Sequence, residues 1–219
     1  MPRALFQKTG NAIYTSHLDL MRVFQRAFKR AGLPLTHTQG FNPRPSVSIA
    51  LPLSLGVESD CELLDFDLEG EVLSNEYILQ QLNNALIDGV KVLSVYDEGK
   101  KIKHLAYLDC SLVLEYDQGF CEDALQQIQA LFRQDTLIVE KKGKNGISEV
   151  DILPMIRTIS AQCLNDHEIQ LQARICCQNP SLNPMQLHAA ICKYLPELTP
   201  DFVTFRRVEV YDHNEEIFR

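Results

Sequence analysis

The sequence contains no tryptophan and no long apolar run. Because no stretch of about 18 consecutive apolar residues occurs, a membrane-spanning helix is not expected. The first ten residues, MPRALFQKTG, lack the apolar core of a signal peptide, so we expect a cytoplasmic location and no membrane partner. At 219 residues, with 45% hydrophobic and 23% charged residues, the composition is typical of a globular protein with one large or two small domains.

Cysteine spacing argues against the usual metal and cluster motifs. The seven cysteines are scattered and odd in number, with no CxxC or CxxxCxxC, so we expect no zinc site, iron–sulfur cluster or disulfide framework. We interpret them as free, mostly buried thiols in a reducing compartment. A P-loop, a GxGxxG turn before a helix, HExxH and GxSxG are also missing. We therefore expect no metal and no cofactor, and we favour a non-catalytic role.

Negative charge is scarce in the first 45 residues. This segment holds seven Lys/Arg and a single acid, Asp19, which gives a net charge of +6, whereas the whole chain carries −8. Residues 46–99 show the opposite pattern, with eleven acids and one lysine. Two interpretations stay open: the basic segment binds a polyanion such as RNA, or the acidic segment neutralises it within the chain.

An amphipathic helix is predicted inside the basic segment. Ser16 is a good N-cap, Asp19 follows at the capping-box position, and Gly32 is a natural stop. Apolar residues recur at three- and four-residue spacing and predict one buried stripe: Leu18, Met21, Phe24, Phe28 and Ala31. The outer face is almost wholly cationic and suits a phosphate backbone, through Arg22, Arg26, Lys29 and Arg30.

A loop with two prolines follows this helix, Gly40-Phe41-Asn42-Pro43-Arg44-Pro45. The prolines fix φ, so the loop is expected to be stiff and to present its side chains in a defined geometry. An aromatic ring beside an amide and a guanidinium suits stacking on and hydrogen bonding to an unpaired base. The alternative is a structural turn with the ring of Phe41 in the core, which we favour for Phe41 alone. The predicted nucleic-acid-binding residues are Lys8, His17, Arg22, Arg26, Lys29, Arg30, His37, Phe41, Asn42 and Arg44.

Catalytic groups are few. His17 is the one candidate general acid or base, for RNA cleavage or modification, although a single histidine is more often structural or on the surface. Asp65 and Asp67 share one face of a strand and could bind a metal, but the alternating pattern indicates that this face meets solvent. Glu149 and Asp151 have the same interpretation.

The first part of the chain predicts the order strand, helix, strand, strand, helix, strand. The second strand is either residues 33–39 or residues 46–51, and the last strand is 90–96. This order is that of a ferredoxin-like β-α-β-β-α-β unit, which we place over residues 1–99.

The second part repeats this order after a polar linker at residues 98–103. It has one additional segment, which includes a basic hairpin tip at 142–146, and residues 148–158 begin as a strand before Pro154 disturbs them. We therefore predict an α+β protein with two tandem ferredoxin-like units and antiparallel sheets, the second unit covering residues 104–219.

Two stretches carry a family resemblance. SHLDLMRVFQRAFKRAGLPL, joined to QGFNPRPSVSIALPLSLGVESDCELLDFDL, resembles the N-terminal part of a radical-SAM-linked family of unknown function. KKGKNGISEVDILPMI is similar to that family's basic hairpin and its Asp-Ile/Leu-x-Pro motif, here Asp151-Ile152-Leu153-Pro154. The resemblance covers most of the chain. It implies a radical SAM protein as partner in RNA metabolism or modification, with the radical chemistry in that partner.

Together these observations favour a non-catalytic RNA-binding accessory protein that presents an RNA, such as a tRNA or rRNA, to a radical SAM partner. Two alternatives stay open. One is a metal-independent RNA endonuclease or RNA-modifying enzyme that uses His17. The other is a docking scaffold that binds the radical SAM enzyme through protein–protein contacts.

Overall fold

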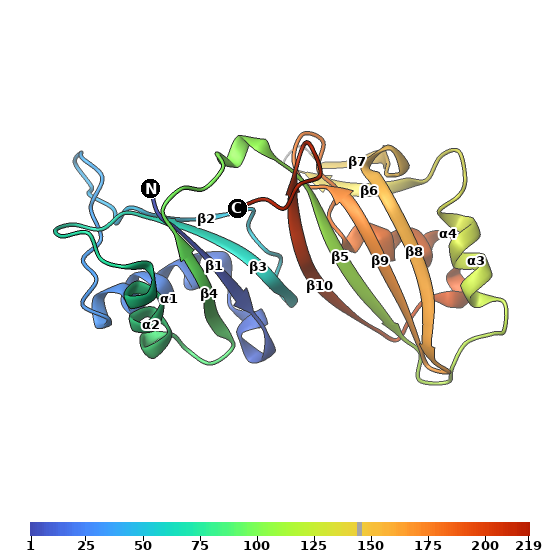
Figure 1. The fold of residues 1–219 in the computed structure, drawn as a ribbon. Helices are drawn as coiled ribbons and strands as arrows, with labels where there is room; N and C mark the ends of the chain where they lie inside the picture. Colours follow the sequence, from blue (N-terminus) through green and yellow to red (C-terminus); the bar gives the residue numbers. More distant parts are fainter. Residues whose placement is uncertain (144–145) are drawn as a thin grey trace. The chain divides into compact units, whose positions relative to one another are not determined.

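The computed structural model describes residues 1–143 and 146–219, and these divide into two units (Figure 1). Unit 1 comprises Met1–His104 together with Phe218–Arg219, and unit 2 comprises Leu105–Ile217. The return of the last two residues to unit 1 is not predictable from the sequence. Phe218 is fully buried there, and the guanidinium of Arg3 lies 5.4 Å from its ring centroid. Part of the predicted basic hairpin tip, residues 144–145, lies outside the described residues.

Unit 1 contains an antiparallel sheet with two helices on one side of it (Figure 1). The strands are ordered β4-β1-β3-β2, and β1 pairs with both β3 and β4. Residues 33–39 contribute only isolated bridges, so the second strand is β2. The elements are β1 (Arg3–Lys8), the 3₁₀ helix η1 (Gly10–Tyr14), α1 (His17–Arg30), β2 (Val47–Ala50), β3 (Val57–Phe66), α2 (Asn75–Ala85) and β4 (Val90–Tyr96).

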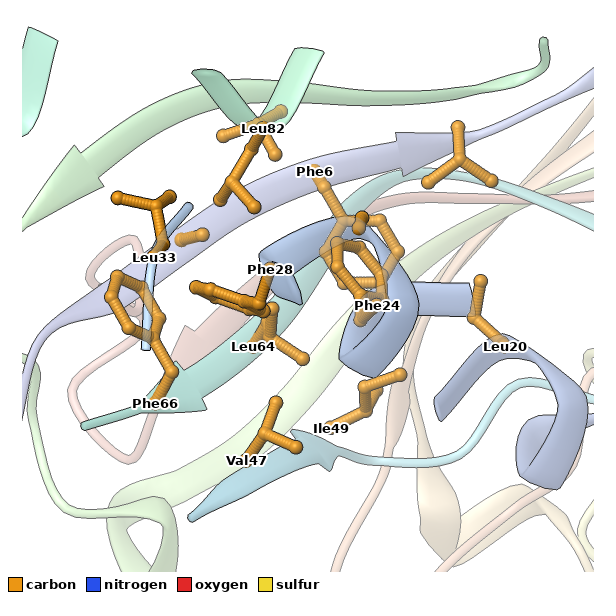
Figure 2. Close-up of a cluster of buried hydrophobic side chains, with 14 of the residues drawn as sticks. Phe6, Leu20, Phe24, Phe28, Leu33, Val47, Ile49, Leu64, Phe66 and Leu82 are labelled. Carbon is orange, nitrogen blue, oxygen red and sulfur yellow. The ribbon is translucent and has the colours of Figure 1, made fainter. Parts of the chain in front are cut away.

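Phenylalanine rings form the centre of the core of unit 1 (Figure 2). Phe6 of β1 meets Phe24 of α1 edge to face, with ring centroids 4.7 Å apart, and Phe28 packs on Phe66 at 5.1 Å. Edge-to-face pairs of this kind add to the burial of apolar area. These contacts hold α1 against the sheet and leave its opposite face in solvent.

The predicted buried stripe of α1 is wrong at one position. Leu18 is 68% exposed, whereas Leu20 is 3% exposed and belongs to the core. An α-helix turns by about 100° per residue, so Leu18 lies about 120° around the axis from Phe24 and Leu20 only about 40°. Residues placed three apart fall about 60° short of a full turn each time, so a repeated spacing of three moves the predicted stripe off the buried face.

Unit 2 contains an antiparallel sheet in the order β10-β5-β9-β8, with α3 and α4 on one side, and a separate β6-β7 hairpin (Figure 1). The ammonium of Lys193 and the hydroxyl of Tyr194, at the end of α4, both donate to the carbonyl of Ile138 at 3.0 Å. These bonds tie the hairpin to α4. The elements are β5 (Leu105–Glu115), α3 (Ala124–Leu131), β6 (Ile138–Gly143), β7 (Gly146–Asp151), β8 (Ile156–Asn165), β9 (Glu168–Cys176), α4 (Met185–Tyr194) and β10 (Phe202–Asp212).

The prediction also differs from the structure between residues 148 and 165. One interrupted strand was expected over 148–158, but two strands, β7 and β8, flank the short turn Leu153–Met155 that contains Pro154. Strand β8 lies at the edge of its sheet and most of its side chains are exposed. Its apolar alternation is therefore weak, which explains why periodicity does not identify it.

The described residues thus form an α+β protein with four α-helices and mostly antiparallel strands. None of the helices described is both long enough and apolar enough to cross a membrane.

Candidate nucleic-acid interface

Residues 36–46 form a narrow arm on unit 1, between α1 and β2 (blue in Figure 1). Its two sides are joined by backbone hydrogen bonds: Ser46 donates to the carbonyl of Thr36 at 2.8 Å, and Thr38 donates to that of Arg44 at 2.9 Å. The backbone N–H of Arg44 also donates to Thr38 Oγ1 at 3.0 Å. These bonds, together with the two prolines, hold the loop that the sequence identifies.

The tip of the arm is exposed. Phe41 has a relative exposure of 107%, so its ring makes no packing contact, and the prediction that Phe41 lies in the core is wrong. Asn42 and Arg44 are exposed as well. Gly40 has a φ of 144°, a conformation that L side chains rarely adopt. A fully exposed ring gives up about 1.5–3 kcal/mol of burial free energy, which favours a role in binding another molecule.

The outer face of α1 supplies two cations without a partner in unit 1. Arg22 pairs with Asp19 of its own helix at 2.7 Å, and Arg30 donates to the carbonyl of Ala85 of α2. Arg26 and Lys29 are exposed. Within residues 1–143 and 146–219, neither side chain forms a salt bridge or a hydrogen bond. Lys29 also borders a groove.

Internal neutralisation of the basic segment would need ion pairs between its cations and the acids of residues 46–99. Arg22 is the cation of α1 that forms a salt bridge, and its partner is Asp19, which precedes residues 46–99. Within residues 46–99, Asp65 of β3 pairs with Arg3 of β1. Hydrogen bonds from Ser16 and Arg22 lower the pKa of Asp19. Among the described residues, no salt bridge connects the outer face of α1 to residues 46–99.

Two predicted residues lie away from this surface. Lys8 is 1% exposed, and its ammonium donates to the carbonyls of Ile13 at 3.2 Å and Thr15 at 2.8 Å. Burial lowers the pKa of Lys8. Lys8 therefore fixes the connection from η1 to α1 and is not accessible to RNA. His17 is half-buried at the start of α1, and no described side chain orients its ring.

A groove of about 360 Å³ lies between the second half of α1 and the base of the arm. Its floor is apolar, and polar side chains from α1, the arm and the segment after β3 surround it. The groove brings together two predicted residues, Lys29 and His37. The lining residues are Gln25, Phe28, Lys29, Leu33, Pro34, Leu35, His37, Pro45 and Glu69.

The sequence does not identify Gln25 and Glu69 as site residues. Gln25 lies one helical turn before Lys29, so the helical spacing could have placed both on one side of α1. Glu69 reaches the groove because its backbone N–H donates to the carbonyl of Pro34 at 2.8 Å and Leu68 bridges Leu35. This is a long-range pairing that local patterns do not contain.

The other candidate groups have structural partners. Asp65 pairs with Arg3, and Asp67 accepts a hydrogen bond from the hydroxyl of Thr36 at 3.0 Å. Asp151 accepts from the backbone of Leu137 at 2.9 Å. The described residues contain no group of three or more His, Cys, Asp or Glu that could hold a metal.

The cysteines are all free. Cys61, Cys110 and Cys177 are buried, whereas Cys121 and Cys163 are exposed, so fewer are buried than the sequence predicts.

Among solved structures, the fold is similar to a chain in the crystal structure of a Cbf5-Nop10-Gar1 complex, with a TM-score of 0.50 and 8% identity. The match covers 95% of this chain and 48% of that one, so this chain spans about half the length of that relative. At this identity the likeness concerns the fold alone. An unknown protein from Galdieria sulphuraria matches with a TM-score of 0.27 and 12% identity, over 94% of this chain and 95% of that one.

A comparison with curated proteins gave no match. Residues 2–184, well over half of the chain, match one protein family. The chain therefore belongs to the family described as "Uncharacterized protein conserved in bacteria (DUF2344)".

Proposed function

We propose that this protein is a non-catalytic RNA-binding accessory protein whose interface consists of the arm and the outer face of α1. The observation that carries the proposal is the fully exposed Phe41, with Asn42 and Arg44 beside it in sequence. An aromatic ring can stack on any unpaired base, because every base has a π-face, and each such contact contributes about 1–3 kcal/mol. Arg26 and Lys29 add positive charge for the RNA backbone.

We further propose that both units are ferredoxin-like. Numbered by their place in the β-α-β-β-α-β order, the strands of unit 1 lie in the order 4-1-3-2. The strands β10-β5-β9-β8 of unit 2 lie in the same order once the β6-β7 hairpin is treated as an insertion. This supports a tandem arrangement, in which the arm is an insertion between α1 and β2 of the first unit.

The proposed partner is a radical SAM protein, to which this chain presents its RNA. The support is the resemblance of residues 16–68 and 141–156 to a radical-SAM-linked family. Any radical chemistry is assigned to the partner.

The stacking contribution can be tested with variants of Phe41. We expect Phe41→Ala to weaken binding of a single-stranded RNA 12-mer by roughly 5- to 150-fold, which corresponds to about 1–3 kcal/mol. Phe41→Tyr should retain the affinity because it keeps the ring. Val72→Ala is the matched control, since Val72 is also fully exposed but lies on another loop. Equal affinities for Phe41→Ala and Val72→Ala would remove the proposal.

The charge contribution can be tested by salt dependence. Each phosphate contact to a single strand adds about 0.7 to the slope of log K against log salt concentration. Arg26→Ala/Lys29→Ala should therefore reduce the slope by up to about 1.4. The control is Lys91→Ala/Lys103→Ala, which removes the same charge from exposed positions elsewhere on unit 1. A double variant that changes the slope no more than this control would show that α1 does not contact RNA.

Protein docking is the second candidate function, because an exposed aromatic ring is also a common anchor in protein interfaces. Two results together would favour this candidate over the first. The chain would capture the radical SAM protein from nuclease-treated lysate, and Phe41→Ala would abolish this capture. The purified chain would bind no RNA.

A further inference from the structure

The groove at the base of the arm has the construction of a small-molecule site. Pro34 and Pro45 give it accessible apolar surface, and Phe28, Leu33 and Leu35, which also line it, are buried. Small apolar pockets of this kind accept an aromatic ring, and a few polar groups then fix its orientation. The volume of about 360 Å³ is at the lower end for ligand sites, so a ring system of modest size fits it better than a peptide segment.

The lining of the groove includes one negative and one positive side chain. Glu69 supplies a carboxylate, which can only accept hydrogen bonds when ionised, and Lys29 supplies an ammonium, which can only donate. Gln25 supplies an amide that can do either. His37 Nδ1 lies 3.9 Å from Glu69 Oε1, a distance that allows an ion pair when His37 is protonated but is too long for a hydrogen bond. Both oxygens of Glu69 are therefore able to accept from a ligand, because no hydrogen bond to them is present in the described residues.

We propose that this groove binds one unpaired guanine base of the RNA, an inference that rests on the proposed RNA-binding function. Guanine has two adjacent donors, N1–H and the N2 amino group, that match a carboxylate in a bidentate contact. It also has two acceptors, O6 and N7, that suit a lysine ammonium. Uracil has one ring N–H between two carbonyl oxygens, which the Glu69 carboxylate would repel. Adenine and cytosine each have an amino group beside an acceptor and can make a single bond to the carboxylate.

The groove shares residues with both parts of the proposed interface. Lys29 lies on both the outer face of α1 and the rim of the groove, and His37 and Pro45 form the base of the arm that carries Phe41. An RNA strand that stacks one base on Phe41 can therefore follow the arm toward its base and place another base in the groove. Phe41 would then supply affinity for any sequence, and the groove would supply preference for one base.

The experiment compares three RNA octamers on the full chain: all uridine, uridine with one central guanosine, and uridine with one central inosine. Inosine lacks the N2 amino group but keeps O6 and N7. We expect the guanosine octamer to bind roughly 5- to 150-fold more tightly than the uridine octamer, the range for a good bidentate base contact. The inosine octamer should lose most of this gain.

The protein variant that tests the contact is Glu69→Gln. It should abolish the preference for guanosine over uridine. Glu71→Gln is the matched control, because Glu71 is an exposed acid on the same loop that does not line the groove. Far-UV circular dichroism confirms that both variants are folded.

The outcomes separate this inference from the proposed function. If the uridine octamer binds and depends on Phe41, but guanosine adds nothing or Glu69→Gln keeps its preference, the groove is not a guanine site and the RNA-binding proposal stands. If none of the octamers binds, both are wrong. A gain that is equal for guanosine and inosine would also overturn the assignment, because the carboxylate contact would then be missing.

Discussion

Alkaline pH should weaken unit 2 because two of its thiols are buried. Burial raises the pKa of Cys110 and of Cys177 from 9.0 to about 12. In the unfolded chain these thiols ionise near pH 9, whereas in the folded unit they stay protonated until about pH 12. The unfolded state therefore loses protons first, and the free energy of unfolding is unaffected well below pH 9 and falls as the pH rises above it.

The size of the effect follows from the two pKa values. At pH 10, ionisation stabilises each unfolded thiol by about 1.4 kcal/mol, since one pKa unit is worth about 1.36 kcal/mol. The two thiols together should lower the free energy of unfolding of unit 2 by about 3 kcal/mol between pH 7 and pH 10. This is a large part of the roughly 5–15 kcal/mol that stabilises a typical domain.

Urea unfolding, followed by circular dichroism in the presence of a reductant, measures this loss. Other groups also titrate in this range, so the useful quantity is the difference between the wild type and Cys110→Ala/Cys177→Ala. This difference should shift in favour of the double variant by about 3 kcal/mol between pH 7 and pH 10. Cys163→Ala, which removes an exposed thiol, is the control for the loss of a cysteine as such. A difference for the double variant that stays constant with pH would refute the reasoning.

Three further predictions concern unit 1. Phe24 is buried and Leu18 is exposed. In urea unfolding, Phe24→Ala should therefore lower the free energy of unfolding by about 3–5 kcal/mol, and Leu18→Ala by less than about 0.5 kcal/mol. Similar losses for the two variants would contradict this difference in burial. Ser16→Ala removes the N-cap bond from the backbone N–H of Asp19 and should lower the free energy of unfolding by about 0.5–2 kcal/mol, measured by thermal unfolding; an unchanged melting temperature would contradict this role of the cap. The side-chain amide of Asn83 accepts a hydrogen bond from the N–H of Val92 at 2.8 Å and donates one to its carbonyl at 2.9 Å. Asn83→Ala should therefore accelerate hydrogen exchange at the Val92 amide. Unchanged exchange would show that the bond to Asn83 does not protect this amide.

The α+β class was predictable because the local patterns are strong where each element has one buried face. Ser16 caps α1 as expected, and the strand over 90–96 is found at those residues. The edge strand β8 was not predictable, because an exposed strand has little apolar alternation to detect. Leu20, rather than Leu18, lies in the core, which shows that repeated spacing of three residues does not by itself fix the buried face of a helix.

The candidate site was predictable in part. The stiff loop at 40–45 is a local property of two prolines and a glycine, so the sequence identifies it. Whether Phe41 is buried depends on what the rest of unit 1 places beneath it, which no local pattern contains. Lys8 illustrates the same limit: its charge suggested a surface role, but the turn at 9–15 supplies two carbonyls that allow it to be buried.

The position of Phe218 has a consequence for synthesis of the chain. Unit 1 buries this ring beside Arg3, yet all of unit 2 lies between the two residues in sequence. A ribosome therefore releases nearly all of unit 1 before the residue that packs beside Arg3 exists. At typical elongation rates the intervening residues take on the order of ten seconds to make. During that interval the nascent unit 1 lacks the ring that packs beside Arg3, so this part of the unit reaches its final packing only after translation of unit 2 is finished.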